Sequence, residues 1–294
     1  PHQKAIFFSP GSEGLIEQLH GKQLSYNNYL DINAALKLIY RFDKPTAAIF
    51  KHTNPCGVAS AADLLTAYKN SFATDTQSPF GGIVILNKPL DMETAQEINK
   101  IFTEIIIAPE FSPEIIEFLT KKKDRRIIKY NPLLLENWSE TPTFVSCLNG
   151  VLCQDIDIKQ DAETEWKIVT EKSPSEEEYN SLRFCWNVVT SLKSNAICLG
   201  RGEQTIGMGM GQTSRIDSTV LAVFRAEKYN HQIEGAVCAS DGFFPFPDVI
   251  QLLAKKGIKA IIQPGGSKGD EEVIKACNDK GISMIFTGCR HFAH

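Results

Sequence analysis

The chain has 294 residues, of which 43% are hydrophobic and 22% are charged, and its formal net charge is −4 at pH 7. This composition is typical of a globular protein with a large core, which we expect to be divided into two domains. The sequence has no broad basic stripe and no apolar run of membrane-spanning length, which argues against a nucleic acid partner and against a membrane-spanning segment.

Eight cysteines are scattered along the chain, none of them in a CxxC pair, and most lie inside apolar runs. We therefore expect buried, reduced thiols in a cytoplasmic protein, and neither a disulfide framework nor a zinc site. The chain begins at Pro1 rather than Met, so we expect a fragment, or a processed or renumbered chain.

Alternating apolar and amphipathic segments predict an α/β fold in the first half of the chain. The run from Lys121 to Arg126 is the one basic cluster, and we interpret it as a solvated helix end. Residues 131–170 are rich in Asn, Pro, Thr and Asp, so we expect irregular structure there and a division into domains 1–160 and 161–294. The expected strands are 47–50, 82–86, 105–107 and 127–128, and the expected helices are 61–72 and 91–102.

The second half opens with another predicted helix, which Ser173 is placed to cap, with Pro174 at its first position and Glu176 closing a capping box. The acidic residues 270–272 favour a helix start by their charge alone. The alternation predicts a layered, largely parallel sheet in each half, with ligands beyond the carboxyl ends of the strands. The remaining expected strands are 196–199, 235–239, 260–262 and 284–286, and the remaining expected helices are 215–228, 248–256 and 270–280.

Residues 240–248, SDGFFPFPD, crowd three phenylalanines and two prolines between a short apolar strand and a predicted helix that starts at Asp248. Aromatic side chains in such a stiff loop are costly unless something covers them. The flat ring system of a ligand would cover them, and Asp248 could accept hydrogen bonds from the amides or ring nitrogens of that ligand. A loop plug that packs on the core is an equally good explanation.

Lys51 and His52 directly follow a predicted buried strand. A lysine can hold a phosphate or polarise an oxygen, and a histidine can accept a proton near neutral pH. The alternative is a turn with exposed polar residues, and Asn54-Pro55 and Gly57 are typical of turns in either case. Two glycines follow Phe80 before the next strand, where they permit either close approach of a ligand or a tight turn.

Three further segments place polar groups at predicted strand ends. Asn195 can hold an amide or a carbonyl oxygen, or it can act as a cap. Residues 207–215, GMGMGQTSR, are not a GxGxxG fingerprint, but backbone amides at a helix start together with Arg215 suit an anion. The C-terminal segment carries Arg290 and His294 after a strand, so it either binds a phosphate or is a solvated tail.

Taken together, these segments resemble the aminoimidazole carboxamide ribonucleotide (AICAR) formyltransferases, the transformylase half of a bifunctional purine biosynthesis protein. The resemblance covers essentially all of the chain, and the order and spacing of the motifs are more specific than any one motif. The matching segments are PHQK at 1–4, LSYNN at 24–28, KHTNPCG at 51–57, FGG at 80–82, KSNAI at 193–197, GQTSR at 211–215, SDGFFPFPD at 240–248, QPGGS at 263–267 and RHFAH at 290–294.

This resemblance implies two cytidine-deaminase-like, three-layer α/β subdomains in tandem, and a homodimer whose active sites are shared across the interface. It implies transfer of a formyl group from 10-formyltetrahydrofolate to the 5-amino group of AICAR, a step in purine biosynthesis. By resemblance, His52 is the proton acceptor, Lys51 stabilises negative charge on the formyl oxygen, and Asn195 positions the formyl group and the amine.

The resemblance also implies the residues that bind each substrate. The nucleotide side comprises Gly81, Glu104, Arg215, Phe243, Arg290 and His294. The folate side comprises Phe80, Ile216, Pro245, Phe246 and Asp248. A potassium ion is implied near Ser194 and Asp241.

The sequence departs from the family pattern at several positions. Val249 follows Asp248 where the family often has Asn, so a polar contact is lost or replaced, and Glu104 stands where some members have Asp. The family has an Arg-Tyr-Gly segment just before the position of Pro1, and we expect truncation or numbering to explain its absence. The cyclohydrolase half is also absent from this sequence, so we expect no ring closure by this chain alone.

Two other classes of protein can be weighed against this one. A zinc deaminase would need a His or Cys beside a Glu together with a paired CxxC, and the sequence has no CxxC. A non-catalytic nucleotide or folate binder, as a remnant of the enzyme, would not need Lys51, His52 and Asn195, and all three are present.

Overall fold

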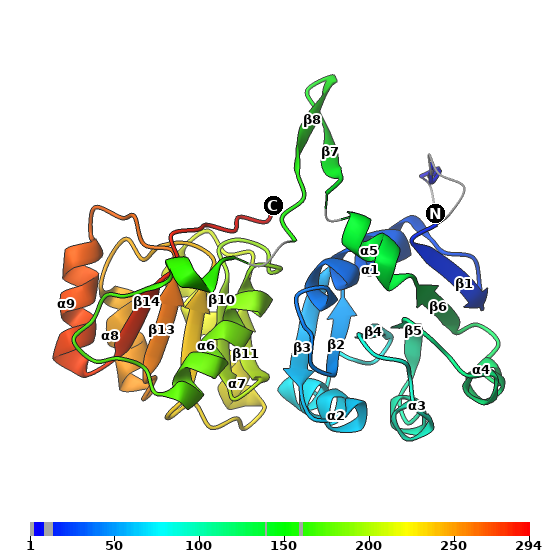
Figure 1. The fold of residues 1–294 in the computed structure, drawn as a ribbon, viewed down its shortest axis with the longest axis horizontal. Helices are drawn as coiled ribbons and strands as arrows, with labels where there is room; N and C mark the ends of the chain where they lie inside the picture. The colour runs from blue at the N-terminus through cyan, green and yellow to red at the C-terminus, as the bar shows by residue number, and fades with distance from the viewer. Residues whose placement is uncertain (1–2, 9–13, 139, 159–160) are drawn as a thin grey trace.

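A computed structural model describes residues 3–8, 14–138, 140–158 and 161–294, so Pro1 and His2 of the first motif lie outside the described residues. Twelve of the described strands form one mixed sheet, which helices cover on both faces (Figure 1). Among the described residues, no helix is both long and apolar enough to cross a membrane.

The elements of the first half are β1 (Ile16–His20), α1 (Tyr26–Ile39), β2 (Thr46–Lys51), β3 (Asn54–Ser60), α2 (Leu64–Thr74), β4 (Gly82–Leu86), α3 (Met92–Ile98), β5 (Thr103–Ala108), α4 (Pro113–Thr120), β6 (Arg126–Tyr130) and α5 (Pro132–Trp138). A hairpin of β7 (Pro142–Cys147) and β8 (Gly150–Asp155) follows, then the 3₁₀ turn η1 (Glu163–Glu165). The second half contains β9 (Lys167–Ile168), α6 (Glu176–Val189), β10 (Ile197–Arg201), β11 (Gln204–Gly209), α7 (Arg215–Lys228), β12 (Val237–Ser240), α8 (Asp248–Lys255), β13 (Ala260–Gln263), α9 (Asp270–Lys280) and β14 (Ser283–Phe286).

The two halves of the sheet have the same connectivity. From the centre outward, the first half runs β3-β2-β4-β5-β6-β1 and the second runs β11-β10-β12-β13-β14-β9. Each half has an edge strand, a helix, a hairpin and then three helix–strand units, in that order along the chain. The halves meet where β3 and β11 pair antiparallel, with Ala59 opposite Gln204. The two halves therefore form a structural repeat, although the sequence contains no visible short repeat.

The sheet is mixed, and the expectation of a largely parallel sheet was wrong for its central strands. The sets β4-β5-β6 and β12-β13-β14 are parallel, but β2 and β10 pair antiparallel with all their neighbours. The reason is that the tight hairpins β2–β3 and β10–β11 reverse the chain before the parallel set begins. As a result, Phe80, Gly81 and Glu104 lie at the amino ends of β4 and β5, not beyond carboxyl ends.

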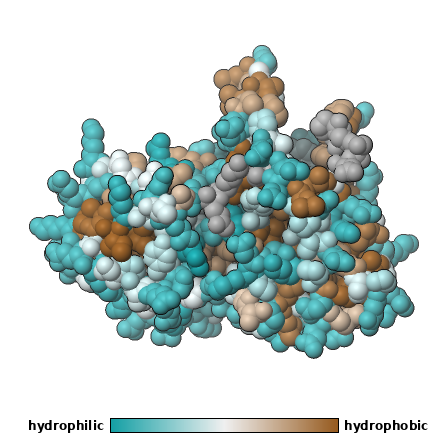
Figure 2. All heavy atoms as spheres, in the orientation of Figure 1, coloured by the Kyte–Doolittle hydropathy of each residue, from teal (hydrophilic) through white to brown (hydrophobic). Residues whose placement is uncertain are grey.

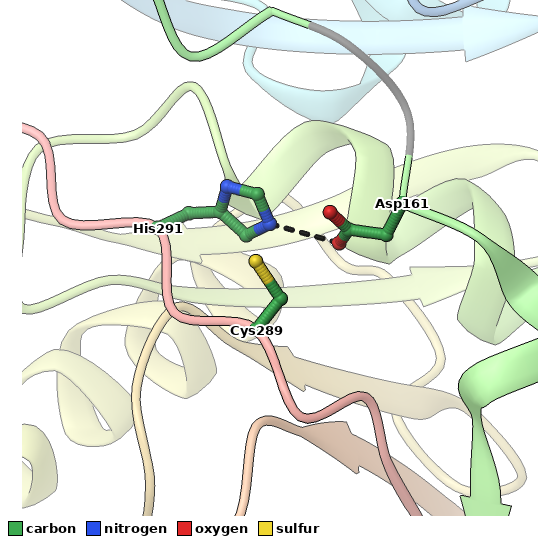
Figure 3. A group of neighbouring side chains, drawn as sticks. All are labelled: Asp161, Cys289 and His291. Carbon is green, nitrogen blue, oxygen red and sulfur yellow. Dashed lines mark hydrogen bonds and ion pairs between the residues drawn. The ribbon is translucent and has the colours of Figure 1, made fainter. Parts of the chain in front are cut away.

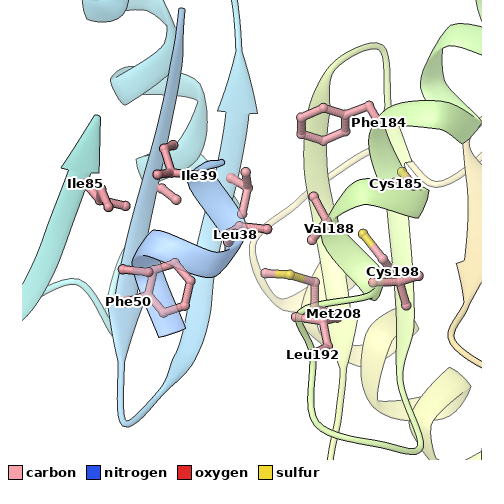
Figure 4. Packing of buried hydrophobic residues seen from close by; sticks show 14 of the residues in the cluster. Leu38, Ile39, Phe50, Ile85, Phe184, Cys185, Val188, Leu192, Cys198 and Met208 are labelled. Carbon is pink, nitrogen blue, oxygen red and sulfur yellow. The ribbon is translucent and has the colours of Figure 1, made fainter. Parts of the chain in front are cut away.

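Apolar side chains fill both faces of the sheet. On one face, α1 and α6 contribute to a single cluster that spans both halves, in which Leu38 and Phe50 of the first half face Val188 and Met208 of the second (Figure 4). On the other face, helices α2 to α4 and α7 to α9 pack in two separate clusters. The shared cluster couples the halves through the hydrophobic effect.

Two local predictions about the first half failed for packing reasons. Gly57 does not form a turn: it lies within β3, and a Cβ there would come 1.9 Å from the backbone O of Ser71 in α2. Asn54 and Pro55 begin the same strand, and the turn falls at residues 52–53 instead. In the basic cluster from Lys121 to Arg126, the residues up to Asp124 are exposed. Arg125 is not, because it is 2% exposed and donates to Asn99 Oδ1 at 2.9 Å.

The start of α6 also differs from its prediction. The N-cap is Ser175, whose side chain accepts the N–H of Glu178 while the Glu178 carboxylate accepts the N–H of Ser175. Ser173 and Glu176 have the same sequence spacing as this pair. Local sequence therefore offered two equivalent capping boxes, and the structure uses the second.

The region expected to be irregular contains an exposed ribbon, the hairpin of β7 and β8. It projects from the body and carries apolar side chains toward its end (Figures 1 and 2). Phe144, Val145 and Leu152 are 59–66% exposed, and Leu148 at the turn is 96% exposed. All eight cysteines are free, but Cys147 and Cys153 lie exposed on this ribbon, contrary to the expectation of buried thiols.

Candidate functional site

The hairpin turn between β2 and β3, here called the Lys-His turn (residues 51–54), presents Lys51 and His52 at one edge of the sheet. His52 and Thr53 both have positive φ, 54° and 62°, as a two-residue hairpin turn requires. Lys51 Nζ donates to the backbone O of Phe80 at 2.9 Å and of Ser78 at 3.3 Å. The ammonium group is thus directed toward β4, while the His52 side chain is exposed.

Helix α1 holds the Lys-His turn through a carboxylate that the sequence did not single out. Asp31 Oδ1 accepts the N–H of Thr53 at 2.6 Å. Glu104 Oε1 accepts Asn28 Nδ2 at 3.2 Å and Arg126 NH1 at 2.8 Å. Burial raises the pKa of Asp31 and the charge of Glu104 adds to the rise, against the effect of the Thr53 N–H. The exposed imidazole therefore interacts with the carboxylate of Asp31, which in turn lies near Glu104.

The glycines that follow Phe80 make a tight turn. Gly81 has φ of 71° and donates its N–H to Phe102 O at 2.7 Å. A Cβ at Gly82 would come 2.9 Å from Phe50 O, so β4 can approach β2 closely only with glycine there. Phe80 is 65% exposed and its ring centroid lies 5.5 Å from that of the half-exposed Phe102. An aromatic pair thus remains open to solvent beside the Lys-His turn.

A second cluster, here called the Asp241 network (Ser194, Asn195, Arg215, Ser240 and Asp241), lies at the same edge in the other half. Asp241 is fully buried, and its carboxylate accepts hydrogen bonds from Arg215 NH1, from Ser194 Oγ at 2.6 Å and from the N–H of Ala196 at 3.1 Å. Arg215 NH2 donates to Asn195 Oδ1 at 2.8 Å. An ion pair therefore fixes the side-chain amide of Asn195.

The repeat shows why this network belongs to the second half only. Asn87 occupies the position in the first half that Asp241 occupies in the second, after β4 and β12 respectively. Its Oδ1 accepts the N–H of Thr46 at 2.7 Å, and its Nδ2 donates to two backbone carbonyls. Leu64 begins α2 where Arg215 begins α7. The first half thus closes this position with neutral groups, whereas the second half uses a charged pair.

The glycine-rich segment before α7 serves packing. A Cβ at Gly207 would come 2.2 Å from Ala222 O, and one at Gly209 would come 1.8 Å from Ser218 O, both in α7. The helix start is capped by Ser214, whose Oγ accepts the N–H of Asp217. The N–H of Asp217 is therefore taken by the chain's own cap, and the Arg215 side chain is directed to the Asp241 network.

The aromatic loop divides between the two explanations offered for it. Phe244 is fully buried and packs in the core, as a plug would. Phe246 is 64% exposed, Pro245 and Asp248 are exposed, and Phe243 is half-buried. Asp248 Oδ1 accepts the N–H of the next residue at 2.8 Å, which leaves its second oxygen available. The loop is anchored by one ring and leaves another uncovered.

The C-terminal segment is fixed beside Asn195. Ser194 donates its N–H to Ala293 O at 2.9 Å, and its Oγ accepts the N–H of Ala293 at 3.2 Å. Lys193 Nζ donates to His294 O at 2.6 Å. Arg290 and His294 themselves are exposed, and the guanidinium of Arg290 lies 5.3 Å from the Phe292 ring centroid. The tail therefore carries two exposed basic side chains next to the Asp241 network, whereas Ile216 is half-buried at the start of α7.

A buried histidine that the sequence did not single out, His291, lies beside Asp161 and Cys289 (Figure 3). His291 is 3% exposed, with Nδ1 2.7 Å from Asp157 Oδ2 and Nε2 2.8 Å from Asp161 Oδ2. Burial lowers the pKa of His291, but the two carboxylates outweigh it and raise the pKa to about 9. Asp161, Cys289 and His291 are the one group of three potential metal ligands among the described residues. Asp157 and Asp161 lie 130 or more residues from His291 in the sequence, so no local motif indicated that they are its partners.

The residues proposed for potassium do not form an open set of ligands. Asp241 already accepts three hydrogen bonds, one of them from its ion-pair partner Arg215, and the Ser194 hydroxyl both donates to Asp241 and accepts from the N–H of Ala293. A cation needs several free oxygen ligands. We therefore derive no step through potassium.

The Lys-His turn and the Asp241 network share a sheet edge but are separated along it. The order β2-β3-β11-β10 puts three strand intervals between Lys51 and Asn195, about 14 Å at the usual strand spacing. The Lys51 ammonium group points to the β4 side, away from the second half. Within one chain, the predicted catalytic residues thus form two clusters.

Comparison with known proteins agrees with this arrangement of motifs. A profile of the family described as AICARFT/IMPCHase bienzyme matches residues 1–225. The chain is 48% identical over 304 residues to the bifunctional purine biosynthesis protein PurH of Chlorobaculum parvum, and 48% identical over 303 residues to that of Chlorobium chlorochromatii. It is 45% identical over 301 residues to the protein of the same name from Persephonella marina.

All of this chain is aligned in each comparison, and it spans 57% or 58% of the length of those relatives. The relatives are named for purine biosynthesis, and the family match covers the first half and the second half as far as residue 225. The chain belongs to the AICARFT/IMPCHase bienzyme family.

Proposed function

We propose that this protein is a formyltransferase that moves the formyl group of 10-formyltetrahydrofolate to the 5-amino group of AICAR. The observation that carries the proposal is the Asp241 network, in which a buried ion pair fixes the amide of Asn195 beside a tail with two exposed basic side chains. The Lys-His turn supplies an imidazole and an ammonium group at the same sheet edge. A role in purine biosynthesis agrees with the names of the relatives.

The chemistry explains why such groups are needed. The 5-amino group of AICAR is a weak nucleophile because the imidazole and the carboxamide withdraw its lone pair. Attack on the formyl carbon creates a tetrahedral intermediate with a negative oxygen, which the Lys51 ammonium group stabilises. His52 accepts the proton that the amine loses. Collapse of the intermediate then breaks the bond between the formyl carbon and the folate nitrogen, which takes up a proton and leaves as tetrahydrofolate. Asn195, held by Arg215, orients the two reactants.

Substrate binding follows from what each exposed group offers. Arg290 and His294 suit the phosphate of the nucleotide, and Arg215, Glu104, Gly81 and Phe243 complete that side. The exposed rings of Phe80 and Phe246 suit stacking on the folate ring system. Asp248 offers one free carboxylate oxygen to the amide or ring nitrogens of that system, and Pro245 and Ile216 complete the folate side.

We further propose that the active site is shared between two copies of the chain. The three strand intervals between Lys51 and Asn195, at least about 14 Å, support this, because one reacting centre must lie within about 3.5 Å of the groups that act on it. The exposed ribbon supports it as well. Val145 lies opposite Leu152 on one face and Phe144 opposite Cys153 on the other, so both faces are apolar. Such a two-stranded ribbon is marginal in water unless it is covered.

The repeat supports the division proposed for the chain. Identical connectivity in residues 16–130 and 167–286 agrees with two related subdomains that join near residue 160, and a cytidine-deaminase-like fold is our proposal for each. Eight unpaired cysteines agree with the cytoplasm as the proposed location.

The direct test is spectrophotometric. The protein is mixed with AICAR and 10-formyltetrahydrofolate, and release of tetrahydrofolate is followed. His52→Ala should lower turnover at least ~100-fold, as expected for loss of a general base. His20→Ala is the matched control, because His20 lies on edge strand β1, at the far side of the first half, where its ring hydrogen-bonds the backbone O of Arg125. Binding of both compounds without turnover would identify a non-catalytic binder, and near-normal turnover in His52→Ala would reject the proposed base.

A further inference from the structure

The buried histidine of the C-terminal segment has two acidic partners and no open coordination position. Its Nδ1 faces Asp157 Oδ2 and its Nε2 faces Asp161 Oδ2, both within 2.8 Å. Asp161 Oδ2 also accepts the indole N–H of Trp186 at 2.7 Å. The Trp186 ring lies edge-to-face with the imidazole, with ring centroids 5.3 Å apart. The ring of His291 is therefore fixed on three sides.

This geometry determines the charge of the ring. A neutral imidazole has one N–H donor and one acceptor nitrogen, whereas an ionised carboxylate only accepts. Both nitrogens of His291 lie at hydrogen-bonding distance from carboxylates, so both must donate, and the ring is an imidazolium. The adjacent Arg41, 1% exposed, pairs with Asp157. Two cations thus balance two aspartates, while burial and Asp161 raise the pKa of Cys289 to about 11 and keep its thiol neutral.

The cluster joins parts of the chain that are distant in sequence. Arg41 follows α1 in the first half, and Asp157 and Asp161 belong to the connection after the ribbon. Trp186 lies in α6, and His291 lies in the tail. The backbone N–H of His291 also donates to Asp241 O at 3.2 Å, so the same residue ties the tail to the network that holds Asn195.

The exposed side chain of Arg290 contacts the Phe292 ring of the same tail, so its position follows the backbone beside His291. His294 is also exposed, and its backbone is held on the other side by Lys193 and by the hydrogen bonds between Ser194 and Ala293. The positions of the two basic side chains therefore depend on His291 together with these hydrogen bonds. A displacement of about 1 Å in a substrate-holding group can cost ~100-fold in rate or affinity.

We propose that His291 is a positioning residue: its imidazolium, clamped between Asp157 and Asp161, holds the C-terminal segment so that Arg290 and His294 meet the phosphate of the nucleotide. The inference rests on the proposed function, since it names the element that shapes the nucleotide side of that site. It assigns His291 no contact with the substrate and no role in proton transfer.

The test compares His291→Ala and His291→Gln with wild type. We expect the KM for AICAR and its calorimetric Kd to rise at least ~10-fold in both, while kcat and the KM for the folate change less than ~3-fold. His231→Gln is the matched control, because His231 also joins the two halves, through Ala73 O at 2.9 Å, but lies away from the tail. It should leave all of these values near wild type. A fall in kcat with an unchanged KM for AICAR would overturn the positioning role.

A second measurement is independent of turnover. In protein labelled with ¹⁵N at histidine, both ring nitrogens of His291 should give the shifts of protonated nitrogens at pH 7.5, in a signal absent from His291→Gln. A ring with one unprotonated nitrogen would overturn the charge argument. Stoichiometric zinc that is lost in Cys289→Ser would also overturn it, and would replace the clamp by a metal site.

The two proposals fail in different ways. If wild-type protein binds AICAR without turnover, the proposed function fails, but the calorimetric comparison still tests His291. If wild-type protein does not bind AICAR, both proposals are wrong, because the tail then has no nucleotide to meet. If binding and turnover are normal in His291→Ala, only the inference about His291 is wrong.

Discussion

Replacing Asp241 by Asn should destabilise the protein by about 3–5 kcal/mol, the usual cost of removing one member of a buried ion pair. Asp241 is fully buried and the Arg215 side chain is 8% exposed, so solvent cannot replace the lost charge. The new amide nitrogen would also replace one of the two acceptor oxygens, either the one that accepts from Arg215 NH1 and the Ala196 N–H or the one that accepts from Ser194 Oγ. Urea denaturation followed by circular dichroism measures the change, with an unchanged dependence on urea concentration.

Two further variants separate charge from packing. Asp217→Asn is the matched control, because the carboxylate of this exposed residue accepts a hydrogen bond from the Ser214 hydroxyl at the start of α7, and its effect should stay within about 1 kcal/mol. The double variant Arg215→Met with Asp241→Asn removes both charges and should be more stable than Asp241→Asn alone. A loss below about 1 kcal/mol in Asp241→Asn, or a double variant less stable than either single one, would refute the reasoning.

Three other results are expected from the fold. Gly209→Ala would place a Cβ 1.8 Å from Ser218 O, so α7 must shift. The free energy of unfolding in urea should fall by ~1–3 kcal/mol, and an unchanged urea midpoint would contradict the packing. His291 has an ordinary pKa of 6.5 that is raised to about 9 in the folded state, so its stabilisation is complete below pH 6.5 and is lost as the pH rises through 9. Wild type should therefore lose more stability than His291→Gln between pH 8 and 10, and parallel curves would count against this. Val145→Lys with Leu152→Lys should shift light-scattering mass from dimer to monomer, whereas a dimer that persists would exclude the ribbon from the interface.

The sequence predicted the buried strands and the motif loops, and the reasons are local. The runs at 47–50, 105–107 and 260–262 are continuous apolar segments, which are typical of strands covered on both faces. The residues after 47–50 and after 260–262 come to the same edge of the sheet, whereas those after 105–107 lie at the opposite edge, because β5 runs antiparallel to β2. We expected the aromatic loop either to pack on the core or to leave its rings open to a flat ligand. Phe244 packs in the core and Phe246 is exposed, so the loop does both.

What the sequence could not give depends on partners far along the chain. The direction of β4 relative to β2 depends on the hairpin turn at residues 52–53. Asn54, Pro55 and Gly57 led us to expect that turn two positions later in the chain. Gly57 looked like a turn residue because its close neighbour, Ser71 in α2, belongs to another element. His291 looked like one of several polar tail residues, because Asp157 and Asp161 lie 134 and 130 residues before it.

The ribbon and α1 were missed for a different reason. The ribbon has no buried face within one chain, so the alternation that marks a half-buried strand is absent. Helix α1 starts with Ser25 and Asn28 rather than the Ser and Glu pair that sequence patterns favour. With α1 unrecognised, Asp31 could not be placed beside the Lys-His turn.

The most direct test of the account mixes two inactive variants, His52→Ala and Asn195→Ala, after joint unfolding and refolding. If the imidazole of one chain and the amide of another serve the same reaction, half of the dimers formed at random carry one intact site. Formyl transfer from 10-formyltetrahydrofolate to AICAR should then return to about a quarter of the wild-type rate. Wild-type protein that is active after the same unfolding and refolding is the control. If that control is active and the mixture stays as inactive as its two components, the shared active site is contradicted.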